Sequence, residues 1–529
     1  MPTIHDILAR GYFPRELPPA FSTEVFANAV VTKKGVKSQF TAEKLSAEVC
    51  VHNLVRSGGV RRHLGVPNPL TYAQLCKFSV QRWKDLSEFA SQSSFSLTKP
   101  VDQKPGRAIQ PDNNLDGRTQ RRIAMRSTAR FVLRTDISRF YPSVYTHSLP
   151  WAIHSKATTK HAVATKSLKS LWGDELDILL RNMNDKQTVG IPIGPDCSLL
   201  VAEVLLSAVD QALLQQLPWV EGIRFIDDYE FAVQYQWQAE QIASVLQSIL
   251  SHFELALNPA KTSIIELPDS FEPLWTSRLR TFVFRDAGIM GQRNDLTAYF
   301  DLAFTFHKQD PDGGVLKYAI PRMNGITVEQ DNWSLFESIL SQCAMVEPAT
   351  LPQICEQLQH YGAEGYQLNV TDWVSVTNLI VTERLALGQA SEAVWAMWLM
   401  KQLRLPLSSQ AADVIATCED AFASLMGLGM ASVGLADMKR LSSLNRFAEP
   451  EELFGKHWLL CYEGAYQGWL VPPSGNGTFS LSSEFNFLST SGVSFFNINA
   501  APLVPRRRVA GPSESDTSGT GGGGGGGYA

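Results

Sequence analysis

An aspartate pair between two β-rich runs is the feature that most constrains the fold of this chain. In IRFIDDYEFAV, Asp227 and Asp228 stand where two runs of β-forming residues meet, which predicts a turn between two strands. The alternating run FVLRTDI ends at Asp136, 91 residues before Asp227, and predicts another strand that ends on a carboxylate. We therefore expect these three carboxylates to form one cluster.

Such a cluster suits magnesium. Carboxylate oxygens are ligands that Mg²⁺ prefers, and two ions held close together would activate a hydroxyl and clamp a triphosphate. A lone aspartate at a strand end is more often a helix cap or turn residue, and a lone Asp-Asp pair is a weak signal. Four patterns follow one another here, however: D-x-x-x-x-aromatic, G-I-P-x-G…S, F-I-D-D and L-x-L-N-x-x-K-T. Their order predicts a nucleotidyl polymerase with two Mg²⁺ ions per active site.

The same runs carry a family resemblance. LRTDISRFYPS, GIPIGPDCSLLVAE, RFIDDYEF and LALNPAKTSI resemble motifs A to D of reverse transcriptases. FYPSVYTHSLPWAIHSK, the Ala-Glu pair after the motif-B serine, and HWLLCYEGAYQGWL more narrowly resemble the bacterial defence-associated and abortive-infection (unknown-group) reverse transcriptases, with the ninth defence type nearest. The resemblance spans roughly residues 55–500.

The resemblance implies an RNA-directed DNA polymerase that acts in antiphage defence and uses dNTPs. It also implies a bound noncoding RNA as template or scaffold. The ninth type further implies a homopolymeric, A-rich DNA product made in a homo-oligomer.

Residue roles follow from the resemblance. Asp136 and Asp227 are expected to bind the metal ions together with the backbone carbonyl of Ile137. Asp228 is expected to support these ligands from the next layer of residues around the ions. Tyr141, five residues after Asp136, is expected to stand against the ribose 2′-hydroxyl and so to select dNTPs. Simple core packing is the alternative for this tyrosine.

In the second motif, Gly190 and Gly194 are expected to let the backbone approach template and nucleotide closely, and Ser198 follows in a helix. The chain departs from the family pattern at two positions: Ile193 stands where glutamine is usual, and Leu199 where proline is usual. Because Ile193 cannot hydrogen-bond nucleic acid, ordinary template handling is in question.

Five cationic residues are further candidates. Lys261 matches the motif-D lysine that donates a proton to pyrophosphate, although a surface lysine after a turn is an equal alternative. Arg122 and Arg126 are expected to grip the triphosphate through bidentate contacts. Arg61 and Arg62 are expected to contact the RNA backbone. For any one of these arginines, a solvated surface position is the alternative.

The predicted fold class is α+β, with right-hand polymerase fingers and palm followed by an all-α, helical-repeat-like domain. Fingers and N-terminal helices are expected over residues 1–135 and the palm over 136–284, where helix and strand alternate. Long amphipathic helices such as SEAVWAMWLMKQLRL, with Ser391 as its N-cap, predict a helical domain in place of a thumb over 285–505. A disordered Gly-rich tail is expected over 506–529.

Charge and cysteine content bear on partners and compartment. The net charge is −5, but nine Lys/Arg face three Asp between residues 104 and 139, as a protein that follows phosphates needs. The seven cysteines show no metal-binding spacing, which favours a reducing cytosol. The first residues contain no apolar signal core, and the uncharged run 421–436 is too short for a membrane span. We expect a cytoplasmic protein without a membrane partner.

The tail offers a candidate primer. Tyr528 follows seven glycines, 521–527, and its hydroxyl is expected to start DNA synthesis and become covalently linked to the product. A tail without function is the alternative, while Tyr145 and Tyr229 in structured segments are rival primers. Three arginines at the base of the tail are expected to contact RNA: Arg506, Arg507 and Arg508.

Three other functions compete. One is a template-independent, terminal-transferase-like DNA polymerase of the same family. Another is a non-catalytic RNA-binding scaffold that kept the polymerase fold. Against the scaffold, a dead site has no reason to keep three desolvated carboxylates. An RNA-dependent RNA polymerase is disfavoured by Tyr141.

Overall fold

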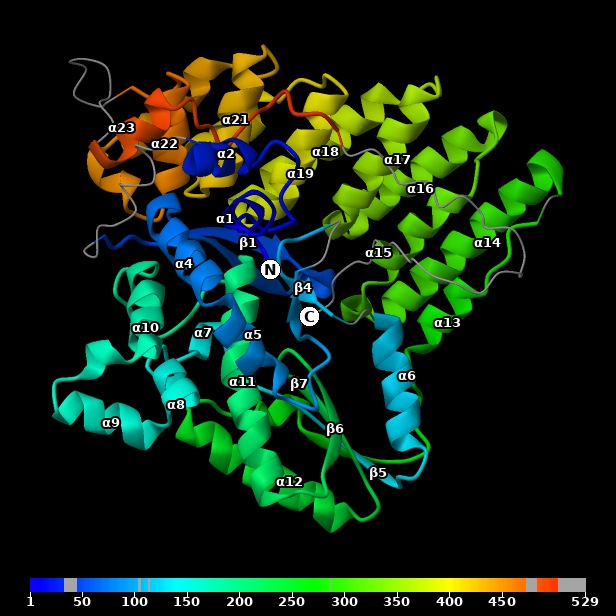
Figure 1. The fold of residues 1–529 in the computed structure, drawn as a ribbon. Coiled ribbons are helices and arrows are strands. Elements are labelled where there is room, and N and C mark those ends of the chain that lie inside the picture. The colour runs from blue at the N-terminus through cyan, green and yellow to red at the C-terminus, as the bar shows by residue number, and fades with distance from the viewer. Residues whose placement is uncertain (33–44, 103–105, 113–114, 286, 472–482, 503–529) are drawn as a thin grey trace.

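The computed structural model describes residues 1–32, 45–102, 106–112, 115–285, 287–471 and 483–502 of the 529. These residues form a mixed α/β fold with small antiparallel sheets and many helices (Figure 1). The expected mixture of helices and small sheets is confirmed. The expected tail, with Tyr528 and Arg506 to Arg508, lies outside the described residues.

A four-stranded antiparallel sheet holds the predicted carboxylates. Its strand order is β6-β7-β5-β8, with bounds β5 (Phe131–Asp136), β6 (Glu221–Phe225), β7 (Asp228–Val233) and β8 (Ser263–Glu266). The central pair, β5 and β7, runs in register from Phe131 opposite Val233 to Asp136 opposite Asp228. The apolar helix α11 (Asp196–Gln216) packs beside α12 (Gln236–His252), which contacts β5 and β7.

The N-terminal region contains a second, smaller hairpin. Strands β1 (Cys50–Val55) and β2 (Arg61–Val66) pair over their whole length around the short 3-10 helix η1 (Ser57–Gly59). Gly58 and Gly59 both have positive φ there, which only glycine adopts without strain. The other elements of this region are α1 (Ile4–Arg10), α2 (Glu24–Thr32), α4 (Pro69–Gln81), α5 (Trp83–Ser91), β3 (Pro100–Val101), β4 (Gln110–Pro111) and α6 (Leu115–Arg126).

Four helices lie between β5 and α11 in the chain, beginning with the short α7 (Phe140–Ser143). The other three form a projecting lobe at the lower left of Figure 1. They are α8 (Ser148–His154), α9 (Lys156–Ala164) and α10 (Trp172–Asn182), with η2 (Leu168–Ser170) between the last two. α9 begins after Ser155, whose hydroxyl accepts from the Thr158 N–H at 3.2 Å, as N-cap residues do.

Beyond β8, every described element is a helix. The α-helices are α13 (Leu274–Arg280), α14 (Gly288–Gln309), α15 (Val315–Ala319), α16 (Trp333–Val346), α17 (Leu351–Ala363), α18 (Val370–Ala386), α19 (Ala390–Gln402), α20 (Ser409–Thr417), α21 (Ala421–Ser432), α22 (Trp458–Tyr466) and α23 (Ser483–Thr490). The 3-10 helices, from the one before β8 onward, are η3 (Pro259–Lys261), η4 (Pro311–Gly313), η5 (Ile320–Gly325), η6 (Gln330–Asn332), η7 (Pro348–Thr350), η8 (Met438–Phe447) and η9 (Pro450–Leu453).

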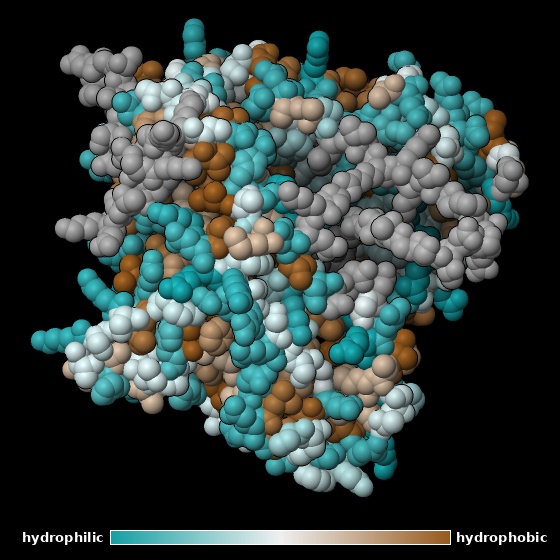
Figure 2. Space-filling view, viewed as in Figure 1, coloured by the Kyte–Doolittle hydropathy of each residue, from teal (hydrophilic) through white to brown (hydrophobic). Residues whose placement is uncertain are grey.

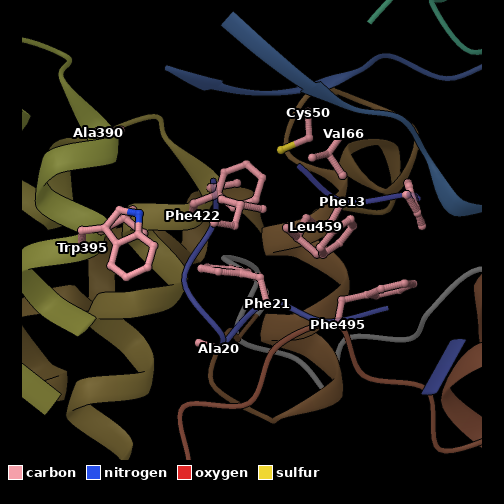
Figure 3. Packing of buried hydrophobic residues seen from close by; sticks show 14 of the residues in the cluster. Phe13, Ala20, Phe21, Cys50, Val66, Ala390, Trp395, Phe422, Leu459 and Phe495 are labelled. Atoms are coloured by element: carbon pink, nitrogen blue, oxygen red, sulfur yellow. The ribbon is translucent and has the colours of Figure 1, made fainter. Parts of the chain in front are cut away.

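The two ends of the described chain share one core. Phe21 forms an isolated antiparallel bridge with Phe496, and its ring lies 5.2 Å from that of Phe422. Figure 3 shows Phe13 beside Phe495 in the same cluster. The hairpin β1-β2 and the first helices are therefore fixed against the C-terminal helices rather than folded separately.

One described helix, α11, is long and apolar enough to cross a membrane by length and composition, but 72% of its apolar window is buried inside the fold. A buried core helix can pass the same test of length and composition. The uncharged run that begins at Ala421 contains another buried helix, α21 (Ala421–Ser432).

Candidate active site

The three predicted carboxylates meet at one edge of the four-stranded sheet. Asp136 ends β5 and lies opposite Asp228, the first residue of β7. Asp227 occupies the turn between β6 and β7, and its carbonyl accepts from the Ile137 N–H at 3.2 Å. This bond ties the turn to the end of β5, so that the backbone of two strands fixes the spacing of the carboxylates.

The residue before Asp227 has an unusual backbone conformation. Ile226 has φ +55°, which is the left-handed region and is costly for a β-branched side chain. Such a residue stores about 1–3 kcal/mol of strain and persists only where its surroundings hold it. The strained turn directs Asp227 toward the edge where Asp136 ends.

Burial and nearby negative charge raise the pKa of Asp227 and of Asp228. Desolvation, followed by the neighbouring Asp228 and Asp136, raises the pKa of Asp227 to about 6. Desolvation also raises the pKa of Asp228, although the nearby Arg118 opposes it. A bound cation would relieve this unfavourable crowding of negative charge.

Asp136 has an oxygen available for a ligand. Its side chain is buried; Oδ2 accepts from Lys261 Nζ at 2.5 Å, while the buried Oδ1 has no hydrogen-bond partner among the described residues. A buried carboxylate oxygen without a partner is unfavourable unless a ligand occupies it. The donor set therefore fits a hard divalent cation such as Mg²⁺.

The protein supplies only part of a metal shell. In the described part of the chain, no three His, Cys, Asp or Glu side chains converge closely enough to enclose an ion by themselves. Mg²⁺ usually keeps several waters and binds through one or two carboxylates plus substrate phosphates. Asp136, Asp227 and the carbonyl of Ile137 would supply the protein ligands.

Cations surround this edge of the sheet. Lys261 contacts Asp136, and the carboxylates at this edge raise its pKa. Arg118 Nη2 lies 3.8 Å from Asp228 Oδ2, and its guanidinium stacks 5.0 Å from the ring centre of Phe225. Arg62 lies within electrostatic range of Asp227, and burial lowers its pKa. These positive charges make the site suitable for a polyanionic substrate.

Three of the predicted arginines form ion pairs with carboxylates of the protein. Arg122 Nε and Arg126 Nη2 bind the two oxygens of Glu230 at 2.9 and 2.7 Å. Arg61 forms a bidentate pair with Glu392 of α19 at 2.8 and 2.7 Å. Their guanidinium groups hold elements together.

Sequence reasoning missed Arg118. It lies on α6 four residues before Arg122, and the helical repeat of 3.6 residues puts the two on one face. That spacing was the signal that would have found it. The same face carries Arg126, so the basic stretch forms one row along α6, with Arg118 at the carboxylate end.

The remaining predicted residues lie around the same edge. Tyr141 lies within the short helix α7 and is half-buried, and burial followed by the charge of Asp227 raises its pKa. Its carbonyl accepts from the Ile191 N–H at 3.0 Å, which joins it to the second motif.

Gly190 and Gly194 of the second motif have φ +94° and +123°, a range that favours glycine. Ser198 is buried in the first turn of α11.

The close approach expected at Gly194 is made by the protein itself. A Cβ there would lie 2.8 Å from Pro14 Cγ, so the backbone contacts the N-terminal segment. Ile193 forms an isolated bridge with Leu64 of β2, and its carbonyl accepts from the Gly65 N–H at 2.8 Å. The second motif therefore joins the hairpin to the sheet region.

A basic surface lies on the projecting lobe. Between Asp136 and Asp174 the chain has no acidic residue, and hydrophilic side chains project at the lobe's lower left edge in Figure 2. The lobe contains three exposed lysines, Lys160, Lys166 and Lys169, and the partly exposed Lys156. Among the described residues, none of these four lysines forms an ion pair. The partly exposed Lys156 lies 3.9 Å from the ring centre of Trp151.

One rival primer is enclosed. The side chain of Tyr229 is 2% exposed, and its hydroxyl donates to Asp210 Oδ1 at 2.7 Å. It has no access to a nucleotide in this conformation. Tyr145 is half-buried, with its ring 5.6 Å from that of Trp151.

No protein-family model and no curated protein matches this chain. Any functional assignment therefore rests on the geometry of the site.

Proposed function

We propose that this chain is a nucleotidyl polymerase of the reverse-transcriptase type, an RNA-directed DNA polymerase. The observation that carries the proposal is the cluster of Asp136, Asp227 and Asp228 at one sheet edge, with Lys261 against Asp136 at 2.5 Å. Under this proposal the four-stranded sheet is the palm, the β1-β2 hairpin belongs to the fingers, and the C-terminal helices stand in place of a thumb.

The reaction joins a 3′-hydroxyl to the α-phosphate of a dNTP. The oxygen–phosphorus bond forms as the bond to pyrophosphate breaks, with the hydroxyl proton lost to solvent. Two bound Mg²⁺ ions would supply Lewis-acid activation of the hydroxyl and stabilisation of the leaving group. The carboxylates position these ions, and Lys261 donates a proton to the departing pyrophosphate.

Positive charge near the carboxylates supports triphosphate binding. Arg118 lies 3.8 Å from Asp228, and Arg62 lies within electrostatic range of Asp227 and Tyr141. Both guanidinium groups match phosphate geometry. Tyr141 next to this position supports selection of dNTPs, because an aromatic ring against the sugar excludes a 2′-hydroxyl.

The wider proposal is an antiviral enzyme of the cytoplasm that carries a noncoding RNA as template or scaffold. The basic lobe supports a nucleic-acid partner, since clustered lysines neutralise phosphates. A homo-oligomer and a homopolymeric, A-rich product belong to the same proposal. Priming by Tyr528, with Arg506, Arg507 and Arg508 on RNA, stays a prediction, because all four lie outside the described residues.

A template-independent DNA polymerase is the second candidate. Ile193 favours it, because its side chain cannot hydrogen-bond a template and its backbone is bound to β2. Both candidates use the same carboxylates and the same chemistry at phosphorus. They differ in whether nucleic acid directs the choice of base.

The test is to purify the protein with its bound nucleic acid, sequence that material, and then supply each labelled dNTP separately with Mg²⁺. Incorporation by the wild type that Asp227→Ala abolishes supports the polymerase. Loss of base preference after ribonuclease treatment supports RNA direction, whereas unchanged preference supports the template-independent candidate. No incorporation of any dNTP would contradict the proposal.

Priming is tested on the product. After synthesis, digestion with nuclease and protease should leave a nucleotide mass on the peptide that contains Tyr528. Tyr528→Phe should then prevent initiation without a nucleic-acid primer. A product with a free end, or wild-type synthesis by Tyr528→Phe, would show that another hydroxyl begins the chain.

A further inference from the structure

A buried charge network lies directly beneath the turn that carries Asp227. Arg224, Glu203 and Asp210 are all 0% exposed. Arg224 Nη1 and Nη2 bind Glu203 at 2.9 and 3.0 Å, and Nε binds Asp210 Oδ2 at 2.8 Å. Apolar side chains of similar volume would often fill such a space at no cost in stability. The polar network therefore calls for a role other than stabilising the core.

This network holds both backbone groups of Ile226. Arg224 Nη1 donates to the Ile226 carbonyl at 2.9 Å, and the Ile226 N–H donates to Thr98 Oγ1 at 3.1 Å. Thr98 Oγ1 in turn donates to Glu203 Oε1 at 2.5 Å. One carboxylate oxygen, Glu203 Oε1, thus orients both groups that hold Ile226.

Ile226 is the residue that needs holding. Its φ of +55° is unfavourable for a β-branched side chain, and its natural relaxation is toward the extended region. Such a change would rotate the following peptide and move the carboxylate of Asp227 away from Asp136. Two hydrogen bonds from a buried, rigid network oppose that relaxation.

The segment that brings Thr98 here is itself fixed to the sheet. The Leu97 N–H donates to the Arg224 carbonyl, and the Arg224 N–H to the Phe95 carbonyl, both at 2.8 Å. Ser93, on the same segment, donates to Asp210 Oδ2 at 2.6 Å. The segment 93–98 thus lies along β6 as an additional strand-like layer, with its hydroxyls turned into the network.

We propose that Thr98, Glu203 and Arg224 are positioning residues, which hold Ile226 in its left-handed conformation and so aim Asp227 at the metal site. The inference rests on the proposed function. None of the three touches substrate, and all three act through the backbone of Ile226. Thr98 is the most specific of them, because it alone contacts the Ile226 N–H.

The decisive variant is Thr98→Val, which keeps the shape of the side chain and removes the hydroxyl. A shift of the catalytic carboxylate should lower kcat about 10- to 100-fold, with the KM for dNTP unchanged. The Mg²⁺ concentration for half-maximal rate should rise. Without nucleotide, the increase in unfolding temperature produced by Mg²⁺ should shrink, which reports ion binding independently of turnover.

Two variants separate positioning from general destabilisation. Thr98→Ser keeps the hydroxyl and should restore kcat and the Mg²⁺ response. Ser93→Ala removes a matched hydroxyl that also serves a network carboxylate, but its backbone donors are Phe95 and Ser96 rather than Ile226. It should lower the unfolding temperature as Thr98→Val does while leaving kcat and the Mg²⁺ response unchanged.

Arg224→Lys provides a second approach if Thr98→Val does not fold. It keeps the charge, loses the fork that reaches Ile226, and should lower kcat in the same way. Wild-type kcat and Mg²⁺ response in Thr98→Val, or equal losses in Ser93→Ala, would overturn the inference and leave the polymerase assignment standing. A wild type that incorporates no dNTP would overturn both.

Discussion

Asp227 is half-buried and has two carboxylate neighbours, Asp136 and Asp228. Its replacement therefore tests catalysis separately from folding. Removing it should lower nucleotide incorporation by at least about a thousandfold, because ligands of a two-metal site act as a unit. The unfolding temperature should stay equal or rise, since the repulsion that raises the Asp227 pKa to about 6 is removed. The measurements are labelled-dNTP incorporation and thermal unfolding of Asp227→Ala.

The control for this experiment is Asp301→Asn, an exposed aspartate on α14, which should retain wild-type incorporation. Incorporation by Asp227→Ala at the wild-type rate would show that the cluster is not catalytic. A large fall in the unfolding temperature would instead show that the cluster holds the sheet edge together.

Tyr141 makes a prediction about sugar choice. The side chain is half-buried beside Asp227, where a ring against the sugar leaves no space for a 2′-hydroxyl. Tyr141→Ala should reduce the preference for dATP over ATP at least about tenfold, equivalent to about 1.4 kcal/mol of discrimination. Tyr141→Phe keeps the ring and should keep the preference. Equal preference in all three proteins would reduce Tyr141 to a packing residue.

The positions of the carboxylates could be predicted from the sequence because short local motifs fix them: Asp136 ends β5, Asp227 lies in the turn before β7, and Asp228 begins β7. The partners of the arginines could not be predicted from the sequence, because a guanidinium on a long flexible side chain can bind residues that are far away in the sequence. Arg126 pairs with Glu230, and Arg61 pairs with Glu392. No local sequence pattern around either arginine indicates which carboxylate it binds. The strain at Ile226 was equally invisible, since it depends on a network assembled from three segments.

At the scale of elements, the lobe of α8, α9 and α10 offers a quantitative test of nucleic-acid binding. Each lysine that neutralises a phosphate contributes about 0.7–0.9 to the slope of log affinity against log salt. Changing Lys160, Lys166 and Lys169 to Gln should therefore reduce the magnitude of that slope by about 2–3. The measurement is affinity for single-stranded RNA at several salt concentrations, without dNTP.

Lys439→Gln is the matched control for the lobe, because Lys439 is exposed on the C-terminal helical region and far along the chain. It should leave the salt slope unchanged. A slope that is equal in the wild type and the triple variant would mean that RNA lies elsewhere on the molecule.

The hairpin β1-β2 and helix α19 are joined by the pair of Arg61 and Glu392. Glu392 is 2% exposed, and breaking a buried pair from one side typically costs about 3–5 kcal/mol. Arg61→Ala should therefore lower the free energy of unfolding by about 3 kcal/mol. Adding Glu392→Gln should recover part of this loss, because the unpaired charge disappears. Chemical denaturation of the single and double variants measures both effects.

The same pair distinguishes two roles for Arg61. If it only joins elements, Arg61→Ala/Glu392→Gln should bind RNA with the wild-type salt slope. If the slope falls by about 1, Arg61 contacts phosphate as the sequence suggested. A free energy of unfolding that does not change in Arg61→Ala would contradict the joining role.

Element boundaries show what local sequence can predict. The run FVLRTDI, expected to be a strand that ends at Asp136, forms β5 (Phe131–Asp136). The start of α19 was predicted wrongly, with Ser391 as N-cap. The helix begins at Ala390, and the Ser391 hydroxyl accepts from the Val55 N–H at 2.9 Å. The Ser391 hydroxyl therefore bonds to the backbone of β1 rather than capping the helix, as the local pattern had suggested.

At the scale of the whole molecule, the two ends of the described chain stabilise one another. The carbonyl of Phe495 accepts from the Ser22 N–H, and that of Ala20 from the Asn497 N–H, at 3.0 and 2.7 Å. Nearly the full length of the chain separates these partners, so no local pattern could indicate the pairing. The helical composition of the C-terminal half was predictable, whereas its packing against the first thirty residues was not.

Glu463 on α22 is a titratable group beside the contact between the two ends of the described chain. It is 0% exposed, accepts from the Ser494 hydroxyl at 3.0 Å, and also binds the Phe495 N–H. Desolvation is the largest influence and raises its pKa from 4.5 to about 7. Since the folded protein holds this proton more tightly than the unfolded chain, the contribution of Glu463 to stability is fully present below pH 4.5. It is lost as pH rises toward 7.

Glu463→Gln should therefore change the pH dependence of folding in one direction. Glutamine keeps a carbonyl oxygen that can accept from the Phe495 N–H, and its amide group can donate to the Ser494 hydroxyl oxygen. Because glutamine never ionises, the variant avoids the loss between pH 4.5 and 7. Relative to wild type, its free energy of unfolding should increase with pH across that window by up to about 3 kcal/mol. Denaturant unfolding at pH 5 and pH 8 measures this change. Glu451→Gln, at an exposed position in η9, should show the same difference from wild type at both pH values. If Glu463→Gln also shows no pH-dependent difference, the carboxyl is already ionised in the folded protein, and the contact between the chain's two ends is held by a charge rather than by a shared proton.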